Sequence, residues 1–198
     1  MVVPHFLQDH HPAANAPRRA HEKLEQLNRI VEQILDLARS TEPQFAPVNL
    51  NRLIEELGLL VRHKLKHQNI QWARKTGADL PPVMGAATQL EQAFLNLILN
   101  AAEAMPGGGT LTITSRALRV PRSSAKPTHV ALEFRDTGQG MTEEQRRRAF
   151  TSLLSTTKAK GTGLGLAIVA RVVEEHRGKI KLRSRPGHGT AVTVILPL

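Results

Sequence analysis

The hydrophobic period of this chain changes once along its length, and that change limits the folds open to it. Through about Ala104 most apolar residues recur every three to four positions, which predicts amphipathic helices. Beyond the turn Pro106-Gly107-Gly108-Gly109 they mostly alternate with polar residues, as in the strands of a half-buried sheet. This order predicts an α+β fold, a two-layer sandwich in which helices cover one face of a mixed sheet.

The same periods place the individual elements. Helices are predicted over residues 21–40, 87–104 and 164–176, and a further helix contains Leu53 to Leu65 and is capped by Asn49 or Asn51. Strands are predicted over residues 69–74, 110–114, 129–135, 179–184 and 191–196. Residues 80–83 are expected to be an extended connection and residues 120–128 a hairpin loop. The apolar face of the helix after Asn49 is expected to consist of Leu53, Ile54, Leu57, Leu60, Val61 and Leu65.

Three segments follow from this layout. Residues 1–20 show no periodicity and contain three prolines, which predicts an irregular tail. The cluster of histidines in that tail is expected to be solvated, with a metal site as the alternative. Residues 21–44 are expected to form an amphipathic helix, followed by a proline-marked linker, whose apolar stripe needs a partner helix. Residues 45–198 then form the second, larger domain.

Composition excludes some functions and leaves others open. The 198 residues contain no Cys, which excludes disulfides and thiolate metal sites, and no apolar run is long enough to cross a bilayer. The net charge of +10 suits a polyphosphate ligand or an acidic protein partner. We expect no nucleic acid partner, because the basic residues are spread along the chain and base-stacking aromatic residues make up only 3% of it.

Two amides interrupt the apolar pattern of the predicted helix over residues 87–104. Asn96 and Asn100 are four residues apart and therefore point the same way. Such amides are costly to bury unless a partner satisfies them, and an amide oxygen is a suitable ligand for Mg²⁺. A cap or a cross-link within the protein is the competing interpretation, so the pair alone does not distinguish a metal site from a structural role.

Two glycine-containing segments are candidates for a nucleotide site. Asp136-Thr137-Gly138-Gln139-Gly140-Met141 directly follows a predicted strand, where Asp136 is placed to accept a hydrogen bond from an exocyclic amine such as that of adenine. Gly161-Thr162-Gly163-Leu164-Gly165-Leu166 opens a predicted helix, whose free N–H groups and partial positive charge suit phosphate. The second segment is neither a Walker A loop nor a dinucleotide fingerprint. A plain structural turn is the alternative for each.

Together, the order and spacing of these segments resemble the histidine kinase branch of an ATPase superfamily that also contains gyrase, the ninety-class heat-shock chaperone and mismatch-repair ATPases. Residues 92–101 look like the N box of that family, residues 136–141 like its G1 box and residues 161–166 like its G2 box. Gly187-His188-Gly189-Thr190 matches a glycine–threonine element near the end of the domain. The resemblance covers residues 45–198 and implies a Bergerat-type ATP-binding fold, while residues 21–40 are similar to the second helix of a dimerisation hairpin.

The resemblance also implies the residues of the site. Asn100 would bind the Mg²⁺ that bridges the ATP phosphates, with Asn96 as the second catalytic residue and Glu103 near the water shell of the metal or the nucleotide. Asp136 would bind the adenine amine, and residues 156–160 would form a short lid. The implied ATP-binding residues are Asn100, Glu103, Asp136, Gly138, Gly140, Met141, Thr157, Lys158, Gly161, Gly163, Leu164, Gly165, Leu166 and Thr190.

The function that the resemblance implies is that of an ATP-dependent protein-histidine kinase of a two-component signalling system. Such a protein transfers the γ-phosphate of MgATP to a His of a dimerisation domain, and from there to the receiver domain of a response regulator. Its full-length parent is expected to be a homodimer through the helical hairpin. The implied location of this chain is the cytoplasm, and a full-length parent anchored to the inner membrane is compatible with it.

No residue of this chain is assigned as the phospho-acceptor. His21-Glu22 imitates the start of the acceptor box, but no Pro follows and His21 opens the helix that resembles the second one of the hairpin. The alternative function is an ATP-hydrolysing clamp of the same superfamily. It is disfavoured because Asn96 stands where those relatives place a Glu base, and an amide cannot take up a proton. A non-catalytic nucleotide-binding scaffold is the third interpretation.

Overall fold

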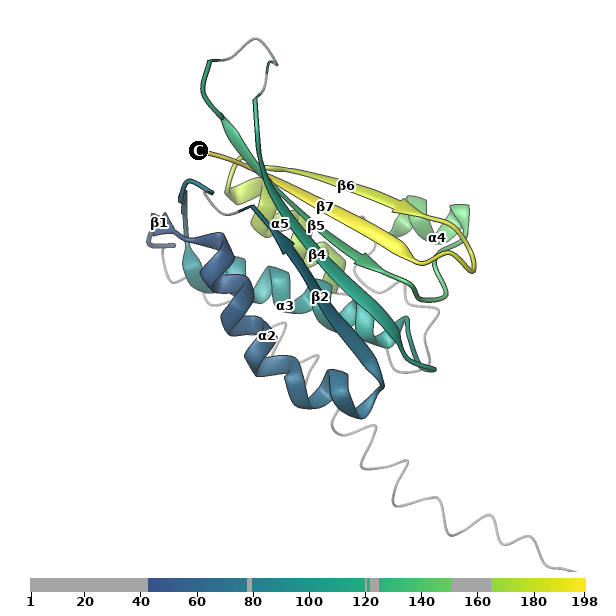
Figure 1. The fold of residues 1–198 in the computed structure, drawn as a ribbon. Coiled ribbons are helices and arrows are strands. Elements are labelled where there is room, and N and C mark those ends of the chain that lie inside the picture. The colour runs from purple at the N-terminus through teal and green to yellow at the C-terminus, as the bar shows by residue number, and fades with distance from the viewer. Residues whose placement is uncertain (1–42, 78–79, 120, 122–124, 151–164) are drawn as a thin grey trace, which may run out of the picture.

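Helices cover one face of a five-stranded sheet in the computed structural model, which describes residues 43–77, 80–119, 121, 125–150 and 165–198 (Figure 1). The strand order is β2-β4-β5-β7-β6. The strands are β2 (Ile70–Thr76), β4 (Gly109–Leu118), β5 (His129–Asp136), β6 (Lys179–Ser184) and β7 (Thr190–Pro197). β2 is parallel to β4 and every other neighbouring pair is antiparallel. The predicted α+β two-layer sandwich is confirmed.

The helices that cover the sheet are α2 (Leu50–His67), α3 (Ala87–Glu103) and α5 (Gly165–Glu175). Asn49 caps α2, because its Oδ1 accepts a hydrogen bond from the Arg52 N–H at 3.1 Å. The other candidate cap, Asn51, instead ties the helix to the sheet. Its Nδ2 donates to the Gly77 carbonyl at 2.8 Å, and its Oδ1 accepts from the Ser115 hydroxyl at 2.9 Å.

The predicted apolar face of α2 is wrong at one position. Leu60 is 64% exposed, whereas Leu50, which the prediction omitted, is buried. At about 100° per residue, Leu60 lies roughly 90° from the centre of the buried stripe, too far around the helix to reach the sheet. Five of the six predicted residues on that face are buried.

Two short elements were not predicted from the sequence. β1 (Ala46–Val48) pairs antiparallel with β3 (Val83–Gly85), where the sequence predicts a linker and an extended connection. Strands of three residues are too short for a period to be visible. α4 (Glu143–Arg148) has six residues and buries none of them, so no apolar period marks it.

Charges and a capping box hold α4 instead. The Thr142 hydroxyl accepts from the Gln145 N–H at 3.3 Å, and the Gln145 side-chain oxygen accepts from the Thr142 N–H at 2.8 Å. Glu143 pairs with Arg146 at 2.7 Å and with Arg147 at 3.1 Å. Hydrogen bonds from these two guanidinium groups hold the pKa of the Glu143 carboxyl below its ordinary value. The charge of this arginine run is therefore partly neutralised within its own helix.

The core lies between the helices and the sheet. Phe94 of α3 is fully buried, and its ring centroid lies 5.5 Å from that of Phe134 on β5. The other large, fully buried side chains are Leu50, Ile54, Leu57, Val83, Leu90, Ile98, Met105, Leu111, Ile113, Leu132 and Leu196. Truncating a buried Phe costs about 3–5 kcal/mol, so this contact fixes the position of α3 over the sheet.

Some predictions concern residues that the structure does not describe. The irregular tail over residues 1–20, the helix over residues 21–40 with His21, and the lid over residues 156–160 all lie outside the described residues. In the described part of the chain, no helix has the length and hydropathy needed to span a membrane. Nor does that part contain a group of three or more His, Asp or Glu side chains positioned to hold a metal.

Candidate functional site

Three segments that are far apart in the sequence meet at one end of the sandwich. They are the end of α3, the loop after β5 and the turn between β6 and β7. The Gln139 N–H in the loop donates to the Ala104 carbonyl at the end of α3 at 3.0 Å. The Gln139 carbonyl in turn accepts from the Gly187 N–H in the turn at 2.7 Å. The loop after β5 is thus bonded on both sides.

Asp136 is the residue that joins the loop to the start of β7. It is the last residue of β5 and only 6% exposed. Its Oδ1 accepts hydrogen bonds from the Gly138 N–H at 2.8 Å and from the Thr190 N–H at 3.1 Å. Two backbone donors therefore fix the orientation of this buried carboxylate, which brings the predicted residues Asp136, Gly138 and Thr190 into direct contact.

The glycines of this region are required by contacts between protein backbones. A side chain at Gly138 would collide with the Ala104 carbonyl oxygen, and one at Gly140 with the Arg185 carbonyl oxygen. Gly140 also has a φ of 67°, in the region that disfavours other residues. The two loops could not pack together without these glycines.

The two amides of α3 face the start of α5. A Cβ added at Gly165, the first residue of α5, would lie 3.2 Å from Asn100 Nδ2 and 3.7 Å from Asn96 Oδ1. Asn100 Nδ2 is buried and has no hydrogen-bond partner among the residues that the structure describes. An unsatisfied buried donor costs about 1–3 kcal/mol, so a ligand that accepts from it would recover that free energy.

The amide pair and the loop after β5 lie close together along α3. The Ala104 N–H donates to the Asn100 carbonyl at 3.1 Å, and the Ala104 carbonyl accepts from Gln139. Four residues of helix correspond to about 6 Å, so one helical turn separates Asn100 from the contact with the loop. Glu103 lies within this turn, half-buried.

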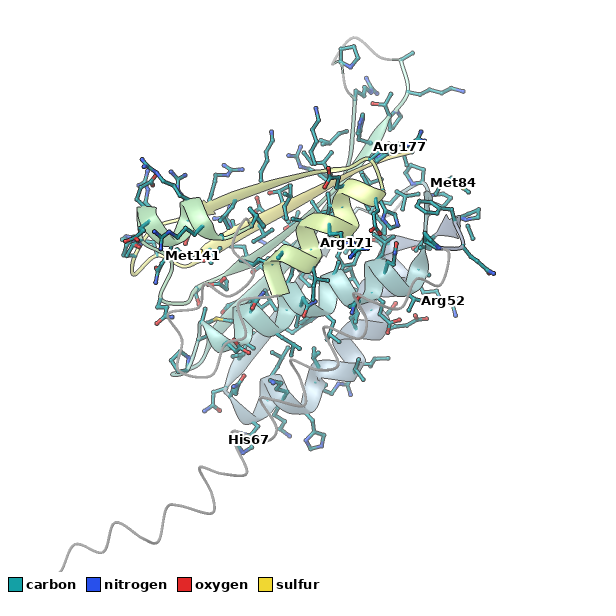
Figure 2. All side chains as sticks on the ribbon, turned by 180° about the vertical axis from the view of Figure 1, so that it is seen from behind. Arg52, His67, Met84, Met141, Arg171 and Arg177 are labelled. Carbon is teal, nitrogen blue, oxygen red and sulfur yellow. The ribbon has the colours of Figure 1, made fainter. Side chains whose placement is uncertain are left out.

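The remaining predicted residues lie either at the edge of this arrangement or outside the residues that the structure describes. Met141 is half-buried and lies beside α4, at the end of the sandwich opposite Met84 and Arg177 (Figure 2). Leu166, in the first turn of α5, packs against the hydrophobic core. Thr157, Lys158, Gly161, Gly163 and Leu164 lie outside the described residues.

Two hydroxyl groups at the site were missed by sequence reasoning. Thr137 Oγ1 accepts from the Thr110 N–H at 3.0 Å and lies 3.7 Å from Met105 Sδ, so it joins the loop to the start of β4. Ser184 Oγ lies 2.9 Å from Thr190 Oγ1 and donates to the Gly189 carbonyl at 3.0 Å. Thr137 stands inside the quoted glycine motif, but no pattern in the sequence distinguishes Ser184.

His176, the buried histidine at the other end of the sandwich, is structural. Its Nε2 accepts from the Ala86 N–H at 2.9 Å, and its Nδ1 lies 2.7 Å from the Val172 carbonyl. Its ring centroid is 4.9 Å from that of Phe45, which precedes β1. Both ring nitrogens are thus engaged, and this side chain links α5 to the small β1–β3 sheet.

Comparison with known proteins identifies a family of ATPases. The family model described as "Histidine kinase-, DNA gyrase B-, and HSP90-like ATPase" matches residues 85–198. That range contains every residue predicted for the site.

Curated relatives extend the similarity towards the N-terminus. Sporulation kinase E of Bacillus subtilis is 31% identical over 176 residues, which is 89% of this chain and 23% of the relative. Sensor histidine kinase ZraS of Escherichia coli is 34% identical over 174 residues, which is 88% of this chain and 36% of the relative. The chain therefore spans well under half the length of these relatives.

Solved structures give the same result for the fold. The catalytic domain of histidine kinase ThkA matches with a TM-score of 0.66 and 32% identity, over 78% of this chain and 95% of that domain. Histidine kinase ThkA in complex with response regulator protein TrrA matches with a TM-score of 0.75 and 28% identity, over 96% of this chain and 53% of the ThkA chain.

Proposed function

Because the chain belongs to the family of histidine kinase-, DNA gyrase B- and HSP90-like ATPases, we propose that it is the ATP-binding catalytic part of a two-component sensor histidine kinase. The kinases among its relatives and the ThkA catalytic domain favour this branch of the family over the others. The activity would be the transfer of the ATP γ-phosphate to a His nitrogen of a dimerisation domain.

One observation carries the proposal more than any other. The loop that follows Asp136 and the helix that bears Asn100 are bonded to each other through Ala104 at one end of the sandwich. The carboxylate suits the amine of adenine, and the amides suit the metal and phosphate end of the same nucleotide. A plain turn and a structural cross-link, the two alternatives for these motifs, would not need to lie side by side.

The residues present fit MgATP. Asn100 offers an amide oxygen of the kind that Mg²⁺ prefers, and its Nδ2 is a buried donor for which a phosphate oxygen is a suitable acceptor. Bound Mg²⁺ would neutralise charge on the phosphates. The part of the protein in the reaction would be to position the γ-phosphate against the acceptor nitrogen and to keep the nucleotide oriented. Gly165 would bring the start of α5, with its N–H groups, towards the phosphates.

The amide at position 96 favours transfer to a protein over hydrolysis. Hydrolysis needs a base that removes a proton from water, and a neutral amide has no capacity for this. Asn96 Oδ1 lies near Gly165, on the same side of α3 as Asn100. No base is therefore proposed at the position that an ATP-hydrolysing clamp requires.

The partners of the whole protein follow from the same proposal. Residues 21–44 would belong to a helical hairpin through which the full-length parent forms a homodimer, and residues 45–198 would be the catalytic domain. Because ThkA was solved in complex with the response regulator protein TrrA, we assign a response regulator receiver domain as the final phosphate acceptor. The domain would work in the cytoplasm, whether or not its full-length parent is anchored to the inner membrane.

Nucleotide titration with and without Mg²⁺, together with a phosphotransfer assay, tests the proposal. The wild-type chain should bind ATP more tightly with Mg²⁺ and should label a supplied dimerisation hairpin that bears its acceptor His. Asn100→Asp places a negative charge beside the phosphates and should lower both signals by at least about tenfold. Gln71→Glu, the same amide-to-acid change on an exposed strand residue, is the matched control.

Two results would contradict the assignment. Equal ATP affinity for the wild type and Asn100→Asp would remove Asn100 from the site. Steady release of inorganic phosphate without any His acceptor, at a rate that exceeds labelling of the hairpin, would favour the hydrolysing clamp instead.

A further inference from the structure

The sheet face turned away from the helices carries a concentration of basic side chains. Cross-strand register aligns its residues in rows, because partners in a ladder point to the same face. The first row is Ala73, Thr112, Arg135, Ala191 and Arg183. The second row is Lys75, Thr114, Glu133, Thr193 and Lys181. The third row is Arg116, Ala131, Ile195 and Lys179.

We call this surface the basic outer face. It is defined by Lys75, Arg116, Arg135, Lys179, Lys181 and Arg183. All six side chains are exposed, and Glu133 is the only acidic residue in the three rows. Figure 1 shows that α2, α3 and α5 all lie on the other side of the sheet.

The single carboxylate is already engaged by its neighbours. Glu133 pairs with Arg135 at 3.0 Å and with Arg183 at 3.9 Å, and the Thr193 hydroxyl donates to it at 3.4 Å. The other four basic residues have no acidic partner in the part of the chain that the structure describes. Their partners in the rows are uncharged, so the face keeps a strong positive charge.

The lack of acidic partners distinguishes the basic outer face from α4, where every arginine is paired. Each arginine of α4 has a Glu three or four positions before it in the same helix. A sheet offers the same opportunity through cross-strand pairs of opposite charge, which stabilise it by about 0.2–1 kcal/mol each. On the outer face Lys75 stands beside Thr114, and Lys181 stands beside Thr193.

We propose that the basic outer face is a docking surface for an acidic patch on a partner protein. Charge complementarity selects the sign of the partner, and a second copy of this face would repel the first. Lys75 and Lys181 lie four strand spacings apart, or about 19 Å, so the patch on the partner has to present carboxylates over a comparable width.

Other anionic partners fit the face less well. Neighbouring strands rotate by about 20–25°, or roughly 80–100° across the sheet, so its two edges cannot both meet a flat bilayer. The three rows contain no aromatic side chain on which bases could stack. The central Glu133 with the hydroxyls around it is a mixed polar pattern. A protein surface can match such a pattern, whereas a uniformly negative surface cannot.

The two rows that contain Lys181 and Lys179 lie farther along the sheet from Asp136 than the row of Arg135 and Arg183, so substitutions at these two lysines allow docking and nucleotide binding to be measured separately. The test uses the full chain and a fluorescent peptide of alternating Glu and Thr, followed by anisotropy at about 50 mM salt, where screening is weak. Lys179→Glu with Lys181→Glu should weaken peptide binding by at least about tenfold. ATP affinity should stay within about twofold of the wild type.

The matched control changes the net charge by the same amount elsewhere. Arg62→Glu with Lys64→Glu reverses two exposed charges on α2, on the helical side of the molecule, and should weaken peptide binding by less than about threefold. If the strand variant does not fold, Lys179→Gln with Lys181→Gln serves in its place and should also weaken binding.

Three outcomes would overturn the proposal. One is an equal loss of peptide binding in the strand and α2 variants, which would show that only net charge matters. Another is absence of peptide binding by the wild type at low salt. The third is tighter binding to phosphatidylserine-rich vesicles or to duplex DNA, abolished by the same strand substitutions, which would assign the face to lipid or to nucleic acid.

Discussion

Replacing Asp136 by Asn separates the structural role of this side chain from its proposed role in binding adenine. The Oδ1 atom of Asp136 accepts the N–H groups of Gly138 and Thr190 at 2.8 and 3.1 Å. An Asn side chain keeps an oxygen that is able to accept both bonds, so the loop should retain its shape. It also replaces the other carboxylate oxygen with an NH₂ group, which repels an amine donor such as that of adenine.

The expected magnitude follows from the loss of one charge-assisted hydrogen bond. Such a bond contributes about 1.5–3 kcal/mol, which corresponds to a loss of roughly 10- to 150-fold in ATP affinity. A purine with a carbonyl oxygen in place of the amine can accept from the new NH₂ group. Affinity for ITP should therefore fall much less than affinity for ATP, or should rise.

Calorimetric titration of the wild type and Asp136→Asn with ATP and ITP measures this directly, with thermal unfolding as the check on the fold. The reasoning is refuted if the variant unfolds at the temperature of the wild type and still binds ATP within about twofold of it. It is also refuted if a well-folded variant loses ATP and ITP affinity equally, since that pattern would place the carboxylate away from the base.

Three further outcomes are expected. Gly140→Ala should lower the free energy of unfolding by more than about 1 kcal/mol in chemical denaturation, because a Cβ at this position has no room and the backbone φ is positive. Gly107→Ala is the control and should be close to neutral, because a Cβ at Gly107 would meet nothing within 4 Å. His176→Leu leaves the buried Ala86 N–H without its acceptor and should cost about 1–3 kcal/mol in the same assay. The ionised carboxylate of Glu143 should stabilise α4 at pH values above 4.5, the ordinary pKa of Glu. This stabilisation should be lost as the pH falls through the lowered pKa that Glu143 has in the fold, which backbone NMR shifts of α4 would report.

The long periodic elements could be read from the sequence because many residues specify them. The predicted helix over residues 87–104 agrees with α3 to within one residue, since its apolar stripe is sustained and a Pro-Gly-rich turn ends it. α4 and the β1–β3 pair escaped prediction because they are short and depend on caps, charges and partners rather than on a period. Leu60 was misplaced because a stripe read by spacing alone has no sharp edge.

The sequence predicts which residues form the candidate site, but it does not predict the backbone contacts that require them. The order of the motifs identified Asp136, Gly140 and Asn100 through a resemblance to a family, and the family itself is confirmed. The backbone that approaches Gly140 belongs to Arg185, far along the chain, so no local pattern predicts that contact. The roles of these residues in binding MgATP stay a prediction until nucleotide binding is measured.

These contacts imply that the two halves of the proposed site form one rigid unit. The Ala104 carbonyl accepts from Gln139 and also blocks any side chain at Gly138, so the loop cannot move along α3 without losing a bond or creating a collision. Asn100 is one turn away in the same helix, which Phe94 anchors to the sheet. The distance between the group proposed for adenine and the group proposed for Mg²⁺ is therefore set by the core before any ligand arrives. A nucleotide whose base and phosphates match that distance would be favoured without cost for ordering these two groups.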